Sequence, residues 1–206
     1  MILSIGRQLG AGGLEVGKQI SERTGMRLYD GELLDEAARE SGLSRDCFKR
    51  VDEQSHHGLG IGIFGMRFPF FSEGSSVNGG ALSGDELFKI QSETIKKLAD
   101  ENRKRGCIFI GRCANYVLRD DSDMRSVFLT ASNEDRIKRV SGRFGCSAEE
   151  AQEMMKKIDH QRTAYFDYYA SRTWGKASSY HICLNTSVLG MERCINIIIE
   201  NLLQIK

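Results

Sequence analysis

Short apolar runs alternate along the chain with longer stretches in which apolar residues recur at helical spacing. The first run, 2–5, is followed by a glycine-rich segment and then by a helical pattern over 14–24, which Gly25 ends. Short apolar runs bounded by polar or glycine-containing turns are typical of buried strands. They predict strands at 2–5, 28–30, 107–110, 126–130 and 180–184.

Helical patterns fill most of the chain between these runs. Ser132 with Asp135, and Ser147 with Glu150, have the spacing of a capping box at a helix start. Together with the apolar periodicity they predict helices at 14–24, 33–41, 44–51, 85–105, 132–144, 147–170 and 191–203. Strands that alternate with helices predict an α/β fold with a parallel sheet and right-handed crossovers.

One segment lacks both patterns. Eight of the 28 residues from 57 to 84 are glycine, and the only proline of the chain, Pro69, lies among them. Loops of this length are typically either functional or disordered. Because regular patterns resume on both sides, we interpret 54–84 as a flexible insertion within a single domain that spans 1–206.

Composition excludes several classes of partner. The formal net charge is +1 and no apolar stretch reaches the length of a membrane span, so we expect neither a nucleic acid polymer nor a membrane as partner. The six cysteines form no C-x-x-C pair, and His56 and His57 have no carboxylate at a suitable spacing, so no protein metal site is predicted. No secretory leader is visible, which favours a cytoplasmic protein with free thiols. The sequence does not indicate an oligomeric state.

The glycine-rich segment between the first strand and the first helix has the design of an anion site. Glycines there let backbone N–H groups converge on a phosphate, and the helix dipole adds positive potential. The strict pattern G-x-x-x-x-G-K-[ST] is absent, because Arg7, Gly13 and Leu14 occupy the positions of the first glycine, the lysine and the hydroxyl residue. The alternative is a tight strand-to-helix turn without a ligand.

Arginines recur in the second half of the chain. Arg112 follows a buried strand, at the edge where α/β sheets bind ligands. Arg136 and Arg139 lie on one face of a predicted helix, and Arg162 lies on the next helix, three residues after Asp159. Several guanidinium groups around one cleft suit phosphoryl transfer, which depends on positioning and on cationic stabilisation. The alternative for the helical arginines is a solvated, salt-bridged surface.

Several motifs resemble those of bacterial cytidylate kinases and, more closely, those of the divergent cytidylate kinase-like family. The likeness covers most of the chain outside about 54–84. The motifs that carry it are Ser4-Ile-Gly-Arg7 with Gly10-Ala-Gly-Gly13, Tyr29-Asp30-Gly31, Gly111-Arg112, Phe128-Leu-Thr-Ala-Ser132, Glu134-x-Arg136-x-x-Arg139, Asp159-x-x-Arg162, Tyr168-Tyr169, Trp174-Gly175 and Asn185-Thr186-Ser187.

The resemblance implies a P-loop NTPase-like three-layer sandwich with a helical lid at about 132–172, and the insertion as an acceptor-side flap. It implies ATP as the phosphoryl donor, Mg²⁺, and a nucleoside monophosphate acceptor such as CMP. Asp30 and Arg112 would bind the acceptor, and Arg136, Arg139 and Arg162 would act as lid cations. The donor phosphates would be held by the loop residues Gly10, Ala11, Gly12 and Gly13.

Two departures from the pattern bear on activity. The loop lacks its lysine and its hydroxyl residue, and Cys113 stands where cytidylate kinases have an aspartate. Arg7 is the better replacement for the missing cation, because Lys18 lies more than one helical turn past the loop. Two alternatives to a nucleotide kinase therefore stay open. One is a nucleotide-binding sensor or partner module without kinase activity, and the other is a kinase with a non-nucleotide acceptor.

Overall fold

The computed structural model describes residues 1–31, 33 and 84–204. The helices expected at 33–41 and 44–51 and almost all of the insertion at 54–84, with His56 and His57, lie outside the described residues.

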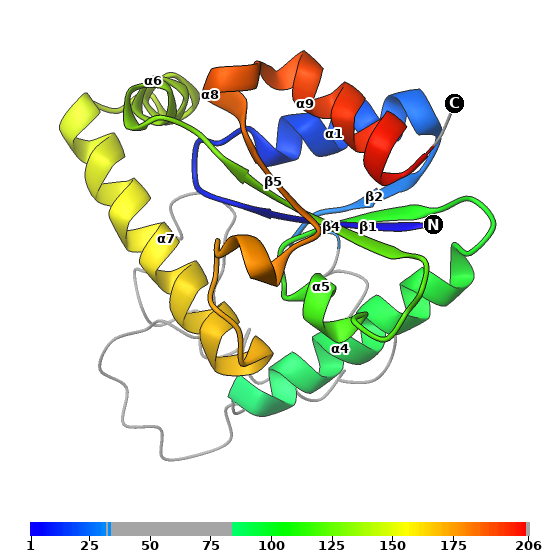
Figure 1. Cartoon of the computed structure of the whole chain (residues 1–206). Helices are drawn as coiled ribbons and strands as arrows, with labels where there is room; N and C mark the ends of the chain where they lie inside the picture. The colour runs from blue at the N-terminus through cyan, green and yellow to red at the C-terminus, as the bar shows by residue number, and fades with distance from the viewer. Residues whose placement is uncertain (32, 34–83, 205–206) are drawn as a thin grey trace, which may run out of the picture.

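The core of the protein is a five-stranded sheet with the strand order β2-β3-β1-β4-β5 (Figure 1). All four strand pairs are parallel, as the alternation of strands and helices predicts. The central strand aligns Ile5 with Ile110 on one side and with Val127 on the other. The strands are β1 (Ile2–Arg7), β2 (Arg27–Tyr29), β3 (Cys107–Ile110), β4 (Met124–Thr130) and β5 (Ile182–Asn185).

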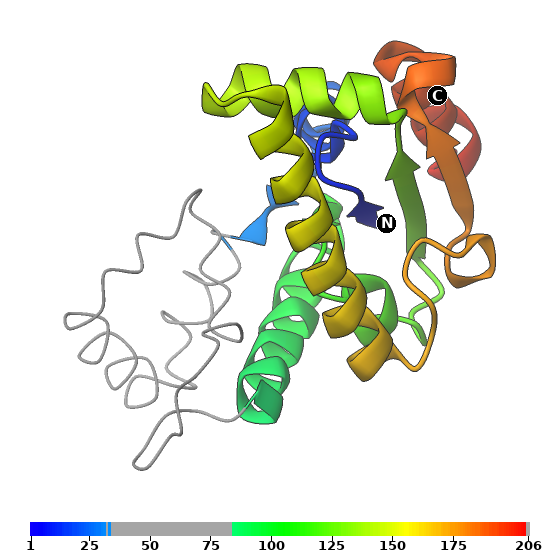
Figure 2. The same cartoon turned by 90° about the vertical axis from the view of Figure 1, so that its left-hand side faces the viewer.

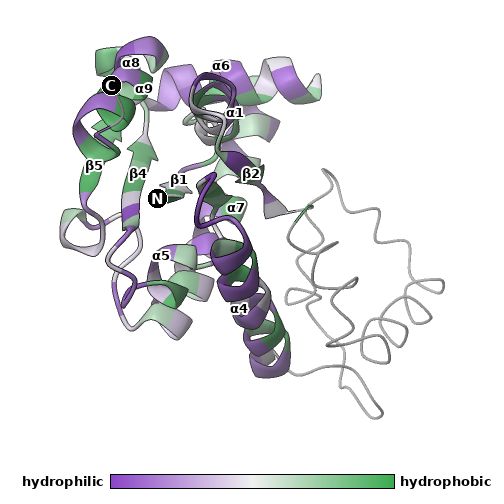
Figure 3. Cartoon of the chain, turned by 90° about the vertical axis from the view of Figure 1, so that its right-hand side faces the viewer, coloured by the Kyte–Doolittle hydropathy of each residue, from purple (hydrophilic) through white to green (hydrophobic). Residues whose placement is uncertain are grey.

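Helices cover both faces of the sheet, which confirms the three-layer α/β arrangement. In Figure 1, α1 and α9 lie over one face and α4 and α5 lie over the other. Figure 3 shows β4 and β5 in largely hydrophobic colours, whereas hydrophilic colours cover much of the length of α4. The helices are α1 (Gly13–Thr24), α4 (Gly84–Glu101), α5 (Ala114–Val117), α6 (Asn133–Phe144), α7 (Ala148–Ala170), η2 (Ala177–Ser179), α8 (Thr186–Leu189), α9 (Met191–Ile197) and a π-helical turn, η3 (Ile198–Leu202).

Two apolar clusters lie on opposite faces of the sheet. Leu3 and Ile5 of β1 point toward α1 and α9, where they pack with Ile20 and Ile195. On the other face, Phe109 and its neighbours pack against α4 and α5. Successive side chains along each buried strand therefore point to opposite faces of the sheet, and both faces are covered by helices. This explains why the strands are continuous apolar runs in the sequence.

The predicted helix starts at α6 and α7 are confirmed. The Ser132 side chain accepts the Asp135 amide at 3.2 Å. Ser147 and Glu150 form a reciprocal capping box with bonds of 2.8 and 3.2 Å. These two helices form the segment 132–172 that we expect to act as a lid, and Figure 2 shows α7 crossing in front of the end of the sheet.

Candidate functional site

The glycine loop at the end of β1 has a left-handed backbone at two positions. Gly10 has φ +79° and Gly12 has φ +82°, values that favour glycine. A Cβ on Gly10 would lie 2.8 Å from the backbone oxygen of Arg136, and a Cβ on Gly12 would lie 2.6 Å from the Met191 side chain. Both glycines are therefore needed for their backbone conformation and for close contact with α6 and α9.

The carbonyl groups of this loop are held by side chains from α6, α7 and α8. Each side chain donates a hydrogen bond across a long stretch of sequence, so the loop is fixed from outside. The bonds run from Arg162 to Arg7 O (3.1 Å), from Arg136 Nε to Leu9 O (2.7 Å), from Arg139 to Gly10 O (3.0 Å) and from Thr186 Oγ1 to Ala11 O (3.1 Å).

Most backbone amides of the loop have no hydrogen-bond partner among the described residues. Leu9 N donates to Asp159 Oδ1 at 2.8 Å, and Ala11 N donates to Gln8 O at 3.2 Å. Within the described part of the chain, the amides of Gly10, Gly12, Gly13 and Leu14 make no hydrogen bond. Gly12 also provides no side-chain cap for α1. Unpaired amides at a helix start form the surface to which an anion binds.

Asp159 links α7, α6 and the loop. Besides accepting the Leu9 amide, its carboxylate pairs with Arg136, and it lies 3.8 Å from Arg162. Both arginines are buried, with 5% and 8% of their surface exposed. Burial lowers the pKa of Arg162 to about 10, an effect that Asp159 opposes and Arg136 reinforces. Arg162 therefore stays positively charged at neutral pH.

Arg7 is the last residue of β1 and lies between the loop and β3. A Cβ on Gly13 would lie 2.7 Å from Arg7 Cγ, and the Arg7 guanidinium contacts Gly111. Within the described residues the Arg7 side chain makes no hydrogen bond or ion pair. Burial and the charges of Arg162 and Arg112 lower the pKa of Arg7, against the opposing effect of nearby carboxylates. A guanidinium in this position would be stabilised by an anion.

Three consecutive residues after β3 adopt left-handed conformations. The φ values are +76° for Gly111, +54° for Arg112 and +55° for Cys113. Two of these residues are not glycine, and such strain is typical of functional sites. The turn directs Arg112 toward Gly31, whose Cβ position would be 3.7 Å from Arg112 Nε. Burial raises the pKa of the Cys113 thiol to about 12, which accords with an inert thiol.

The predicted residues fall into two groups. Arg7, Arg112, Arg162 and Asp30 gather at the carboxyl edge of the sheet, since the charges of the other three all affect the pKa of Arg7. Asp30 also accepts the Leu33 amide at 3.1 Å. Arg136 and Arg139 contact the loop from the side of α6.

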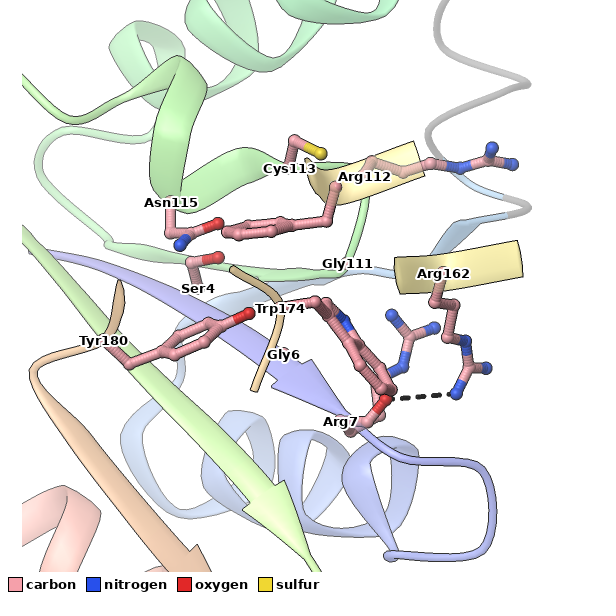
Figure 4. Close-up of a pocket in the computed structure, with 11 residues that line it drawn as sticks. Ser4, Gly6, Arg7, Gly111, Arg112, Cys113, Asn115, Arg162, Trp174 and Tyr180 are labelled. Atoms are coloured by element: carbon pink, nitrogen blue, oxygen red, sulfur yellow. Dashed lines mark hydrogen bonds between the residues drawn. The ribbon is translucent and has the colours of Figure 1, made fainter. Parts of the chain in front are cut away.

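A small cavity of about 40 Å³ adjoins the first group (Figure 4). Its walls come from β1, from the turn after β3, from α7 and from the segment that precedes β5. Three of its lining residues, Arg7, Arg112 and Arg162, are predicted site residues. Among the others, which the sequence did not assign to a site, are Ser4, Asn115, Phe166, Trp174 and Tyr180.

Neither a metal cluster nor a membrane span occurs among the described residues. That part of the chain holds no group of three or more His, Cys, Asp or Glu side chains arranged to bind a metal. It also contains no helix that is both long and apolar enough to cross a membrane.

Comparisons with known proteins agree with this fold. An uncharacterized protein from Eubacterium ventriosum is 26% identical, with a TM-score of 0.74 over 100% of this chain and 99% of that one. Shikimate kinase from Bacteroides thetaiotaomicron is 14% identical, with a TM-score of 0.52 over 98% of each chain, and so shares the fold. No curated protein matched the chain.

A family model covers nearly the whole chain. The model of the cytidylate kinase-like family matches residues 2–188, which include the glycine loop, the turn after β3, α6 and α7. A kinase-like family on a kinase fold supports a nucleotide-binding phosphotransferase. Because the match spans far more than half of its length, the chain belongs to the cytidylate kinase-like family.

Proposed function

We propose that the protein transfers the γ-phosphoryl group of ATP to a nucleoside monophosphate, with CMP as the first acceptor to test. The observation that carries this proposal is that two kinds of hydrogen-bond donor without a partner among the described residues lie next to each other at one edge of the sheet. The start of α1 has unpaired amides, and the neighbouring Arg7 guanidinium has no protein partner within the described residues. Family membership and the kinase fold support it.

In this proposal the donor phosphates lie on the glycine loop. The unpaired amides of Gly10, Gly12 and Gly13 bind phosphate oxygens, and Ala11 belongs to the same turn. Arg7 supplies the positive charge that the missing lysine would provide. The aliphatic part of its side chain packs on Gly13, which places the guanidinium beside the loop.

The acceptor lies against Arg112 and Asp30. An oxygen of the acceptor attacks the γ-phosphorus, the bond from that phosphorus to the β–γ bridging oxygen breaks, and ADP leaves. Negative charge spreads over the transferred group during this step. Arg7 and Arg162 lie close enough to influence each other and would stabilise that charge together.

The loop is unsuited to hold Mg²⁺ by itself. Leu14 occupies the position of the hydroxyl residue, and an apolar side chain cannot ligate a cation. Mg²⁺ favours phosphate oxygens and water as ligands, so we expect it to arrive with the nucleotide.

The hydrogen bonds of Arg136 and Arg139 favour a supporting role. Each already donates to a loop carbonyl, at 2.7 and 3.0 Å respectively. Together with Arg162 they hold three loop carbonyls and so fix the shape of the loop. Their direct contact with the transferred group as lid cations stays a prediction, because it requires these bonds to break when the nucleotide binds.

One observation favours a second function, a nucleotide-binding protein without kinase activity. The lysine and the hydroxyl residue are absent from the loop, and their loss removes several kcal/mol of transition-state stabilisation unless other groups replace it. ADP release by the purified protein, measured with Mg²⁺-ATP and a panel of monophosphates, separates the two. We expect turnover with CMP, whereas ATP binding without turnover would favour the second function. Turnover only with non-nucleotide acceptors would redirect the acceptor assignment.

A further inference from the structure

The cavity beside Arg7 contains two polar groups that lack good partners. Ser4 is 2% exposed, and its hydroxyl makes no hydrogen bond with any described residue. Asn115 is 7% exposed, and its one side-chain hydrogen bond to a described residue is a long contact of 3.4 Å from Nδ2 to Ser179 O. Figure 4 shows Ser4 and Asn115 next to each other, on the side of the cavity away from Arg7 and Arg162. Both side chains line the cavity, and polar groups that open onto a cavity without a good protein partner are expected to bind a water molecule or a ligand there.

The two ends of the cavity have different chemistry. Arg7, Arg162 and Arg112, the last of which the proposed function places against the acceptor, make one end cationic. Ser4 and Asn115 make the other end, here called the inner end, neutral and polar. The aromatic side chain of Trp174 lies between the two ends, and it is held by an edge-on contact with Phe128 at 5.0 Å. A complementary ligand has an anionic group, a short stem and a neutral hydrogen-bonding group.

The inner end selects the type of neutral group. A serine hydroxyl both donates and accepts, and the free Asn115 Oδ1 only accepts. A hydroxyl on the ligand matches both, since it can donate to one and accept from the other. A carboxylate has no proton for Asn115 Oδ1, and an ammonium group would be repelled by the nearby arginines. The volume of about 40 Å³ exceeds the roughly 10–15 Å³ that one water molecule needs, so a small ligand group can enter the cavity.

We propose that this cavity is a subsite for a hydroxyl group of the acceptor, and that the acceptor is therefore a hydroxylated phosphate compound. The inference rests on the proposed function and deepens it, because it adds Ser4 and Asn115 to the acceptor site. The same chemistry occurs in a free sugar phosphate and in the sugar of a nucleotide.

Glycerol 3-phosphate and propyl phosphate test the subsite, because they share a three-carbon stem and differ in their hydroxyls. Binding to the full chain is measured by ligand-observed NMR. Wild-type protein should bind glycerol 3-phosphate about tenfold more tightly, the effect of one satisfied hydrogen-bonding site. Ser4→Ala should abolish that preference while inorganic phosphate binds unchanged. Ser92→Ala is the control, because the Oγ of Ser92 on α4 is buried without a hydrogen-bond partner among the described residues, and Ser92 does not line the cavity.

Each outcome has a definite meaning. Equal affinity of the wild-type protein for the two compounds, or a preference that survives Ser4→Ala, would overturn the inference and leave water as the occupant. If Ser4→Ala lowers the melting temperature strongly, Ser4→Cys keeps the shape and repeats the test. Ribose 5-phosphate and CMP distinguish a free sugar phosphate from a nucleotide as the acceptor. The compound whose affinity falls in the Ser4→Ala variant carries the hydroxyl that binds in the cavity.

The test also separates the subsite from the kinase proposal. A preference for glycerol 3-phosphate without any ATP turnover would support the subsite and contradict the proposed kinase activity. Turnover with CMP at equal kcat/KM in wild-type and Ser4→Ala protein would keep the kinase and remove the subsite.

Discussion

Arg162 donates a hydrogen bond of 3.1 Å to the backbone carbonyl of Arg7, which joins the middle of α7 to the last residue of β1. The bond fixes the backbone of Arg7 but leaves its guanidinium without a partner among the described residues. One arginine thus holds the main chain in place, and the other presents a charge to the site.

Replacing Arg7 by methionine should weaken anion binding and stabilise the fold. The folded protein lowers the pKa of Arg7, so the positive charge at this place is unfavourable without a ligand. We expect Arg7→Met to raise the melting temperature and to reduce ATP affinity by at least about tenfold, the effect of a lost charge-assisted bond. Isothermal titration calorimetry and thermal unfolding measure the two effects. Lys18→Met, on the exposed surface of α1, is the control and should change neither.

Asp159 should be essential for stability. Its removal would leave Arg136 and Arg162 as buried charges without their carboxylate. We expect Asp159→Asn to lower the free energy of unfolding by about 3 kcal/mol, as is typical when one partner of a buried ion pair is lost. Urea unfolding gives the value. Glu153→Gln removes the same charge from the exposed side of α7, and a loss as large there would contradict our account.

Two glycines should respond to alanine in opposite directions. Gly10 combines φ +79° with a Cβ position 2.8 Å from a backbone oxygen, so Gly10→Ala should cost at least about 2 kcal/mol. Gly142 in α6 has open space around its Cβ position, so Gly142→Ala should stabilise the protein by about 0.5–1 kcal/mol. Chemical denaturation of both variants checks the difference, and a tolerated Gly10→Ala would show that the loop is loosely held.

Stability should fall in mild acid because of His181. Its Nδ1 accepts the Ser126 amide at 3.0 Å, and burial, Arg125 and Arg172 lower its pKa from 6.5. A lowered folded-state pKa means that the stability from neutral His181 is complete above about pH 6.5 and is lost as pH falls through the lower value. His181→Asn supplies an oxygen acceptor that does not titrate, so this variant should lose less stability than wild type between pH 7.5 and pH 5. His160→Asn, exposed on α7, should behave like wild type.

Local patterns in the sequence were enough to predict most of the framework. The apolar runs identify the strands, and Ser132 and Ser147 mark helix starts that the structure confirms. Ends were less accurate. The helix predicted to reach residue 105 ends at Glu101, where Asn102 bonds the carbonyl of Leu98 with its side chain and a series of turns leads to Gly106.

The site was only partly accessible to sequence reasoning. Arg7 could be selected because it flanks the glycine loop. The bond between Asp159 and Leu9 spans 150 positions, and nothing local to either residue indicates it. The sequence predicts Ser4 only as part of a strand, which is confirmed. Its place in the cavity depends on α5 and α7, which are distant in sequence, so no local pattern indicates it.

The outside support of the glycine loop has a consequence for the order of folding. The loop is among the first parts of the chain to be synthesised, yet the side chains that hold its carbonyls follow 127 to 175 residues later. Contacts over such separations form late, because a long stretch of chain must first be ordered. A growing chain that stops before α6 would therefore have strands β1 to β4 and α1 but none of the side chains that hold the loop carbonyls.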